Sequence, residues 1–118
     1  MDFSIEENGG ATIIRIQIAR VIYPLLPGLV RKTKEAVEGG ARLLVLDLGA
    51  VSYIDSATIG CIMDIYRLAK DQGGALHILA PQARVETMLS MAGVHKIVPI
   101  FREEDEALRA FVSEGGKN

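Results

Sequence analysis

The chain has 118 residues, of which 49% are hydrophobic and 24% are charged. This length suits one domain of roughly 100 to 150 residues, and the composition is that of a folded protein rather than a disordered chain. Thirteen basic and fifteen acidic side chains give a formal net charge of −2, so the chain lacks the positive field that attracts nucleic acid or anionic lipid. We therefore expect a single domain over residues 1–118 that does not bind nucleic acid directly.

Cysteine content and hydropathy bear on the cellular compartment. Cys61 is the one cysteine, so it can form neither an internal disulfide nor a cage of thiolate metal ligands, and we interpret it as a small buried apolar residue. Residues 1–8 do not have the basic start and apolar stretch of a signal peptide, and no apolar run approaches the length of about 20 residues that spans a bilayer. A cytoplasmic, unprocessed protein without membrane insertion is expected.

The first half of the chain predicts a hairpin, a helix and a buried strand. Residues 3–18 read as two strands joined by a turn at 8–10, where two glycines supply positive φ angles. Prolines 24 and 27 suit the first turn of a helix that ends at Gly39 and Gly40. Residues 42–48 form a nearly continuous apolar run, which is typical of a central strand covered on both faces.

The second half continues the alternation of strands and helices. A loop over residues 49–54 leads into a helix that begins at Asp55 or Ser56 and stops before the glycine pair 73–74. The remaining predicted elements are a strand at 75–80, a short helix opened by Pro81 and capped by Gly93, a short edge strand at 97–101, a helix from Glu103 with Leu108 and Phe111 as core contacts, and a frayed tail at 113–118.

This order of elements predicts the α/β class. Strands that alternate with helices favour right-handed crossovers and a mainly parallel sheet. We expect a mixed, mostly parallel sheet of about five strands with an N-terminal antiparallel hairpin and about four helices, counted from the periodicity of the sequence.

The pair Asp55–Ser56 is the strongest candidate for a functional site. In open α/β sheets, functional groups gather where strands end and helices begin. Either residue is also an ordinary helix N-cap, whose side-chain oxygen accepts a backbone N–H two or three residues on. Residue type alone therefore leaves both interpretations open.

The segment around this pair adds a family resemblance. Residues 51–60, read as VSYIDSATIG, follow the apolar strand and resemble the signature of the bacterial anti-sigma-factor antagonists of the STAS domain family. The end of the helix at 70–74 and the passage Ala92-Gly93-Val94 with Ile97 are also similar to family patterns. The resemblance covers about residues 40–112, and more weakly the hairpin, and it implies a STAS-like fold.

What the resemblance implies is a non-enzymatic switch. The serine after the motif aspartate, here Ser56, would be phosphorylated by a partner that is both an anti-sigma factor and a serine kinase. The unphosphorylated antagonist would bind that partner, phosphorylation would break the complex, and a serine phosphatase would restore it. The expected partner-binding residues are Tyr53, Asp55, Ala57, Thr58, Ile59 and Met63. Residues 23–26 begin the preceding helix at the same edge, where they serve either the core or a partner surface.

Two positions depart from the family pattern. Thr58 stands where glycine is common, and it is interpreted either as a second phosphate acceptor or as a polar residue of the first helical turn. In the family that this chain resembles, an acidic residue lies beside the serine. Ile22 occupies its place, which predicts altered kinase recognition, an unusual partner or a scaffold role.

The sequence leaves a second STAS function open and argues against catalysis. A second STAS reading is a scaffold subunit of a stressosome-like complex, or an accessory subunit of a membrane transporter, with other STAS proteins or a second copy as partners. Catalysis is not expected, because no nucleophile, base and metal cluster is recognisable and His77 and His95 fall on a predicted strand and loop. No phosphate-binding glycine motif occurs, so no cofactor is predicted.

Overall fold

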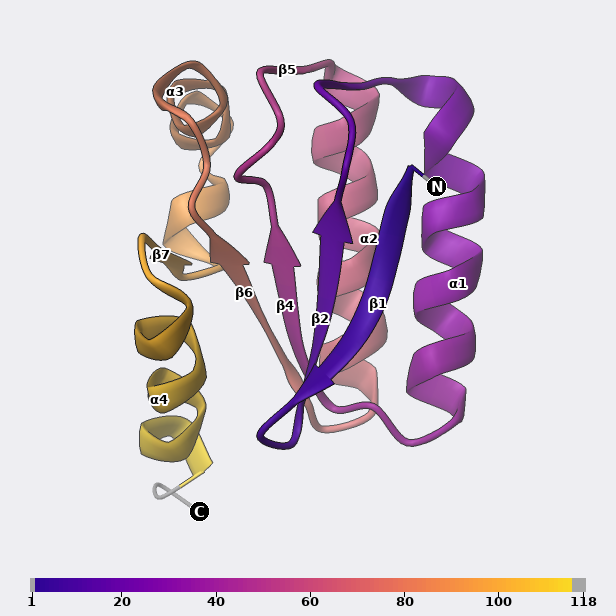
Figure 1. Cartoon of the computed structure of the whole chain (residues 1–118), viewed down its shortest axis with the longest axis vertical. Coiled ribbons are helices and arrows are strands. Elements are labelled where there is room, and N and C mark those ends of the chain that lie inside the picture. The colour runs from indigo at the N-terminus through magenta and orange to yellow at the C-terminus, as the bar shows by residue number, and fades with distance from the viewer. Residues whose placement is uncertain (1, 116–118) are drawn as a thin grey trace.

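A five-stranded sheet with helices on both faces forms the molecule, as the computed structural model of residues 2–115 shows (Figure 1). The strand order is β1-β2-β4-β6-β7, with β1 antiparallel to β2 and every other neighbouring pair parallel. The strands of this sheet are β1 (Phe3–Asn8), β2 (Ala11–Ile16), β4 (Leu43–Asp47), β6 (Ala75–Leu79) and β7 (Ile100–Phe101). The predicted α/β class and mixed sheet are confirmed.

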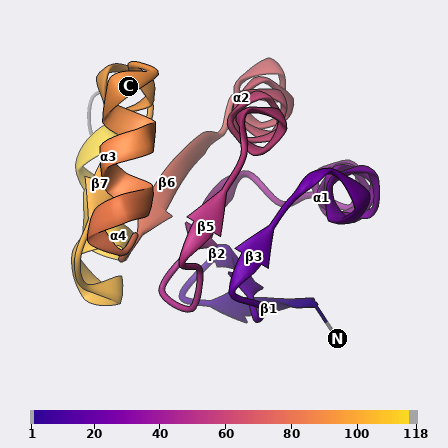
Figure 2. The same cartoon turned by 90° about the horizontal axis from the view of Figure 1, so that it is seen from above.

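The helices divide between the two faces of the sheet. Helices α1 (Leu26–Glu38) and α2 (Ser56–Asp71) pack side by side on one face of the sheet, with α2 behind the strands and α1 to the right of β1 in Figure 1. Helix α4 (Glu104–Gly115) lies on the opposite face beside β6 and β7. Helix α3 (Ala83–Met91) lies beyond the carboxyl end of β6, as the view from above in Figure 2 shows. Two 3₁₀ turns, η1 (Tyr23–Leu25) and η2 (Val94–Lys96), precede α1 and β7.

Alternating side chains of the central strands build a core on each face. Leu44 and Leu46 of β4 pack with α1 and α2, whereas Val45 points to the other side and packs with Phe111 of α4. All three β4 residues are at most 1% exposed. The apolar run at 42–48 was therefore correctly predicted to be a central strand covered on both faces.

Three predicted glycine positions have the backbone geometry that the sequence demanded. Gly9 and Gly10 adopt φ angles of 58° and 86°, which close the hairpin between β1 and β2, and Gly93 adopts φ 78° just after α3. Only glycine takes such angles without steric cost. The predicted hairpin turn and the predicted helix cap are both confirmed.

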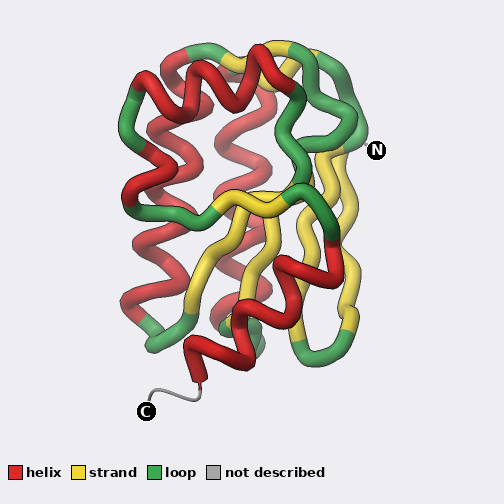
Figure 3. Tube along the Cα trace, turned by 90° about the vertical axis from the view of Figure 1, so that its left-hand side faces the viewer, coloured by secondary structure: helices red, strands yellow, loops and turns green. Residues whose placement is uncertain are grey.

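The structure also differs from the sequence prediction in two connections. Residues 49–54 were expected to be a loop, but Tyr53–Ile54 form β5, which pairs in parallel with β3 (Arg20–Val21) in a separate two-stranded sheet. The last strand was expected at 97–101, but only Ile100–Phe101 pair, because the N–H groups of Ile97 and Val98 bond back to the carbonyl of Val94. The trace in Figure 3 shows this short strand between two turns.

The C-terminal helix continues past the point where fraying was expected. Helix α4 extends to Gly115, and residues 116–118 of the expected frayed tail lie outside the described residues. Among the described helices, none combines the length and the apolar character needed to cross a membrane.

Candidate functional site

The candidate site is built on the first turn of α2, where the chain leaves β5. Asp55 is the N-cap residue, with extended backbone angles of φ −110° and ψ 179°, and its Oδ1 accepts a hydrogen bond from the Thr58 N–H at 2.9 Å. Ser56, the first residue of the helix, is exposed. The predicted N-cap is therefore Asp55, which leaves the Ser56 hydroxyl on the surface beside a helix N-terminus.

Thr58 has the opposite environment to Ser56. Its side chain is only 3% exposed, and its Oγ1 lies 2.7 Å from the carbonyl oxygen of Val21 and 2.8 Å from Oδ1 of Asp55. Both neighbours are acceptors, so the single hydroxyl proton of Thr58 is shared between them. In this conformation Thr58 is a buried contact between α2 and β3.

The Asp55 carboxylate is stabilised in its charged form. The hydrogen bond from the Thr58 hydroxyl is the largest cause, and the backbone N–H groups of Thr58 and Tyr23 add to it, so the pKa of Asp55 lies below its ordinary value. Hydrogen bonds to an ionised carboxylate favour the charged form over the neutral one. Asp55 therefore brings a fixed negative charge next to the Ser56 hydroxyl.

The two-stranded sheet holds the turn before α2 against the chain that leads to α1. Arg20 pairs with Tyr53 in the register of β3 and β5, and its guanidinium carbon lies 4.4 Å from the centroid of the Tyr53 ring. The N–H groups of Ser52 and Tyr53 both donate to the carbonyl of Ala19, at 2.8 and 3.1 Å. Residues 19–21 and 52–58 thus form one connected unit that carries Ser56.

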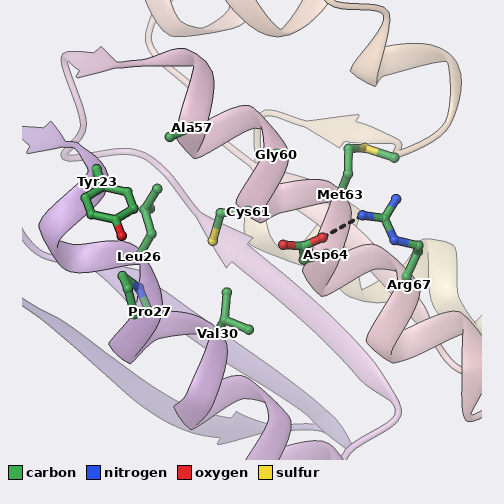
Figure 4. Close-up of a pocket in the computed structure, with 10 residues that line it drawn as sticks. All are labelled: Tyr23, Leu26, Pro27, Val30, Ala57, Gly60, Cys61, Met63, Asp64 and Arg67. Atoms are coloured by element: carbon green, nitrogen blue, oxygen red, sulfur yellow. Dashed lines mark hydrogen bonds and ion pairs between the residues drawn. The ribbon is translucent and has the colours of Figure 1, made fainter.

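An apolar groove of about 500 Å³ runs between α1 and α2 next to this unit (Figure 4). Small residues of α2 open it and α1 supplies the facing wall, and its lining consists of Tyr23, Leu26, Pro27, Val30, Ala57, Gly60, Cys61, Met63, Asp64 and Arg67. Asp64 and Arg67 form an ion pair along α2, so this end of the groove has no net charge. Tyr23 is 66% exposed at the opposite end, next to the α2 N-terminus.

Cys61 lies in the floor of this groove and is 5% exposed. Burial, with a smaller contribution from Asp64, raises the pKa of its thiol to about 11. The thiol is therefore protonated at neutral pH and a weak nucleophile, which agrees with its interpretation as a small apolar residue.

The predicted partner-binding residues fall into distinct environments. Ala57 and Met63 line the groove, Tyr53 lies under Arg20, and Ile59 is half-buried against the main core. Thr58 faces inward and contributes nothing to an outer surface. The sequence did not predict a role for Arg20, Asp64 or Arg67. Arg20 reaches Tyr53 through the pairing of β3 with β5, whereas Asp64 and Arg67 line the groove from α2 itself.

Ile22 lies at the junction between β3 and η1. It is half-buried in extended conformation, and it lines a second shallow cavity of about 400 Å³ together with Ile18, Pro24 and Leu25. The position where the family resemblance implied an acidic residue is thus apolar here. Among the side chains that the structure describes, those of residues 2–112, no group of three or more His, Cys, Asp or Glu could hold a metal ion.

Comparison with known proteins finds relatives of similar sequence. An "Anti-sigma F factor antagonist" of Paenibacillus polymyxa is 34% identical over 65 residues, which are 55% of this chain and 56% of that protein. The matched segments span 56% to 66% of the length of the three curated relatives compared.

Solved structures share the fold at low sequence identity. An anti-sigma-factor antagonist (STAS) domain protein from Planctomyces limnophilus superposes with a TM-score of 0.86 at 16% identity, covering 95% of this chain and 99% of that one. The anti-sigma factor antagonist SpoIIAA in its unphosphorylated form gives 0.79 at 18% identity, covering 90% and 92%, and the phosphorylated form of the Bacillus protein gives 0.72 at 17%, covering 92% and 97%.

A sequence model of a protein family assigns this chain to a family. The model of the STAS domain matches residues 2–107, which includes the whole main sheet and the turn that carries Asp55 and Ser56. The fold, the motif and this match agree, and the chain belongs to the STAS domain family.

Proposed function

We propose that the chain is an anti-sigma-factor antagonist whose binding to an anti-sigma factor with serine kinase activity is controlled by phosphorylation of Ser56. The observation that carries the proposal is the exposed Ser56 hydroxyl on the first residue of α2, directly after the N-cap Asp55. The name of the Paenibacillus relative and the existence of unphosphorylated and phosphorylated forms of SpoIIAA support it.

The charge change at Ser56 provides the physical basis of the switch. A phosphoserine carries about −1.5 to −2 charge and three acceptor oxygens. The N–H groups of the first turn of α2 that lack an acceptor within the helix can donate hydrogen bonds to the phosphate oxygens, and we expect the domain to stay folded. A partner surface that fits a neutral hydroxyl would then meet a dianion next to the Asp55 carboxylate, and repulsion and desolvation weaken the complex.

Exposure favours Ser56 over Thr58 as the phosphate acceptor. A kinase must place the acceptor hydroxyl in line with the transferred phosphoryl group, which needs an accessible side chain. Ser56 is exposed, whereas Thr58 is 3% exposed and its hydroxyl is shared between Val21 and Asp55.

The partner is proposed to dock on the surface that surrounds Ser56. Tyr53, Asp55, Ala57, Ile59 and Met63 are the expected contacts, and the groove between α1 and α2 extends this face with apolar area. Interface centres are depleted in charge and enriched in apolar and aromatic residues, which suits the exposed Tyr23. A serine phosphatase would restore the binding form, and a cytoplasmic location follows from these partners.

Three variants of the tagged full-length chain test this function. Wild type, Ser56→Ala and Ser56→Asp are used to capture partners, and the recovered ATP-dependent kinase is then incubated with each variant. Wild type should gain the mass of one phosphate, Ser56→Ala should gain none and keep its partner, and Ser56→Asp should lose most of its partner. Ser90→Ala, which changes an exposed serine of α3, is the matched control. Equal phosphate uptake by Ser56→Ala and wild type would disprove the switch.

A further inference from the structure

Thr58 makes a contact that its place in the motif does not explain. Branching at Cβ restricts the side chain in a helix, and threonine is a weaker helix former than most residues. Here the side chain is 3% exposed and turned away from the surface that carries Ser56. A residue of this kind in the first turn indicates a specific tertiary contact.

That contact joins three parts of the chain. The Thr58 hydroxyl lies 2.7 Å from the Val21 carbonyl on β3, 37 residues earlier, and 2.8 Å from Oδ1 of Asp55. The backbone N–H of Thr58 donates to the same Oδ1 at 2.9 Å. One residue therefore links β3, the N-cap and the first turn of α2.

The contact lies next to Ile22, at the end of β3. Val21 precedes Ile22, which is apolar and half-buried at the end of β3. An isoleucine side chain at this position cannot bind the α2 N-terminus through charge or hydrogen bonds. The Thr58 hydroxyl bonds instead to the carbonyl oxygen of Val21, the residue before Ile22. A glycine at position 58 has no side chain that could make this bond.

We propose that Thr58 is the positioning residue of the Ser56 switch, because its hydroxyl fastens Asp55 and the α2 N-terminus to β3 and so fixes the turn that presents Ser56. The effect on phosphorylation rests on the proposed function above. The local coupling between Thr58, Asp55 and β3 does not depend on that function and can be measured without a partner.

The coupling is tested by removing only the hydroxyl. In full-length Thr58→Val, which keeps the shape of the side chain, the pKa of Asp55 followed by carbon NMR should rise toward that of an ordinary aspartate. Hydrogen exchange of amides 20–22 and 53–58 should become about tenfold faster, the expected effect of one hydrogen bond to a charged network. Thr58→Ser, which keeps the hydroxyl, should restore both values.

A matched control separates this effect from the general loss of a buried hydroxyl. Thr33 in α1 is also fully buried, but its hydroxyl bonds to the Leu29 carbonyl of its own helix at 2.8 Å. Thr33→Val should leave the Asp55 pKa and exchange at 53–58 unchanged. Thr58→Ala provides the same test if the Thr58→Val variant does not fold. An unchanged Asp55 pKa and unchanged exchange in the hydroxyl-free variants would overturn the proposal.

The kinase recovered with the wild-type chain tests the consequence for Ser56. Thr58→Val should lower kcat/KM for phosphorylation of Ser56 about tenfold, and Thr58→Ser should restore it, since the acceptor is no longer held in one orientation without the hydroxyl. A normal rate in Thr58→Val would overturn the positioning role even if the local coupling is found. Phosphate uptake by Ser56→Ala would instead refute the proposed function and leave the NMR result to decide the coupling.

Discussion

At the scale of single residues, Asp55 links the stability of the site to pH. Its carboxylate accepts hydrogen bonds from the Thr58 hydroxyl and N–H, and its pKa is lowered in the folded chain. In the unfolded chain the group returns to an ordinary aspartate value of about 3.9. Folding is therefore favoured by the charged form of Asp55, and protonation removes that contribution.

The sign of this linkage gives a prediction for Asp55→Asn. The asparagine still caps the helix but cannot ionise. The stabilisation that wild type gains over the variant should be fully present above about pH 4, the ordinary aspartate value, and should be lost as the pH falls through the lower folded pKa. Urea unfolding of both proteins from pH 2 to 7 measures it. Parallel curves over that range would show that the charge of Asp55 does not contribute.

At the scale of elements, Gly74 sets how closely the end of α2 approaches the start of β4. The Ala75 N–H donates to the carbonyl of Arg42 at 2.9 Å, and a Cβ built on Gly74 would lie 2.0 Å from that same oxygen. Real Cβ atoms do not approach a carbonyl oxygen so closely, so a side chain at position 74 would force the backbone at Gly74 or at Arg42 to shift. The glycine pair that was predicted to stop the helix also permits this pairing.

Gly74→Ala should lower the free energy of unfolding by more than about 2 kcal/mol, because backbone rather than a flexible side chain must move. Gly28→Ala in α1 is the matched control. A Cβ there meets nothing within 4 Å and φ is not positive, so the variant should gain about 0.5 to 1 kcal/mol from its helix propensity. Urea denaturation compares the two. Similar small effects in both variants would contradict the close approach.

Element boundaries show where sequence patterns stop being informative. The strands 43–47 and 75–79 are long enough for their apolar runs to identify them, and the predicted and observed ranges agree closely. β3 and β5 have two residues each, which is too short for any periodicity. Their pairing joins residues more than 30 positions apart, which no local pattern encodes.

At the scale of the whole molecule, Arg15 connects the hairpin, the central strand and the last helix. Its guanidinium lies 3.0 Å from Glu6 of β1, 2.8 Å from Asp47 of β4 and 2.9 Å from Glu104 of α4. The Arg15 side chain is 26% exposed, so these bonds are partly shielded from water. The same cluster receives a hydrogen bond from the Asn8 side chain to Glu104.

Arg15→Met should destabilise the fold by about 1 to 3 kcal/mol at neutral pH, because three neighbouring carboxylates lose their shared donor. Lys32→Met is the control, since the Lys32–Glu35 pair is more than half exposed at 53% and 55% and such pairs contribute well under about 1 kcal/mol. Thermal and urea unfolding at low and high salt measure both. Equal losses in the two variants would show that the Arg15 cluster acts as an ordinary surface pair.

Local chemistry was readable in the sequence because it depends on neighbours in the chain. The hairpin glycines, the buried strand at 43–47, the N-terminus of α2 and the motif around Ser56 each follow from residues a few positions apart. The STAS family assignment could be predicted for the same reason, since its motif is contiguous. These features determined the fold class and the candidate serine.

Only the tertiary structure decided what surrounds that serine. The burial of Thr58, its hydrogen bond to Val21, the stacking of Arg20 on Tyr53 and the groove between α1 and α2 all join segments far apart in the chain. No local pattern encodes such contacts, because their geometry arises when the helices pack against the sheet and exclude water. The sequence therefore singled out Ser56 as the candidate acceptor, and the packing leaves Ser56 exposed while it buries Thr58.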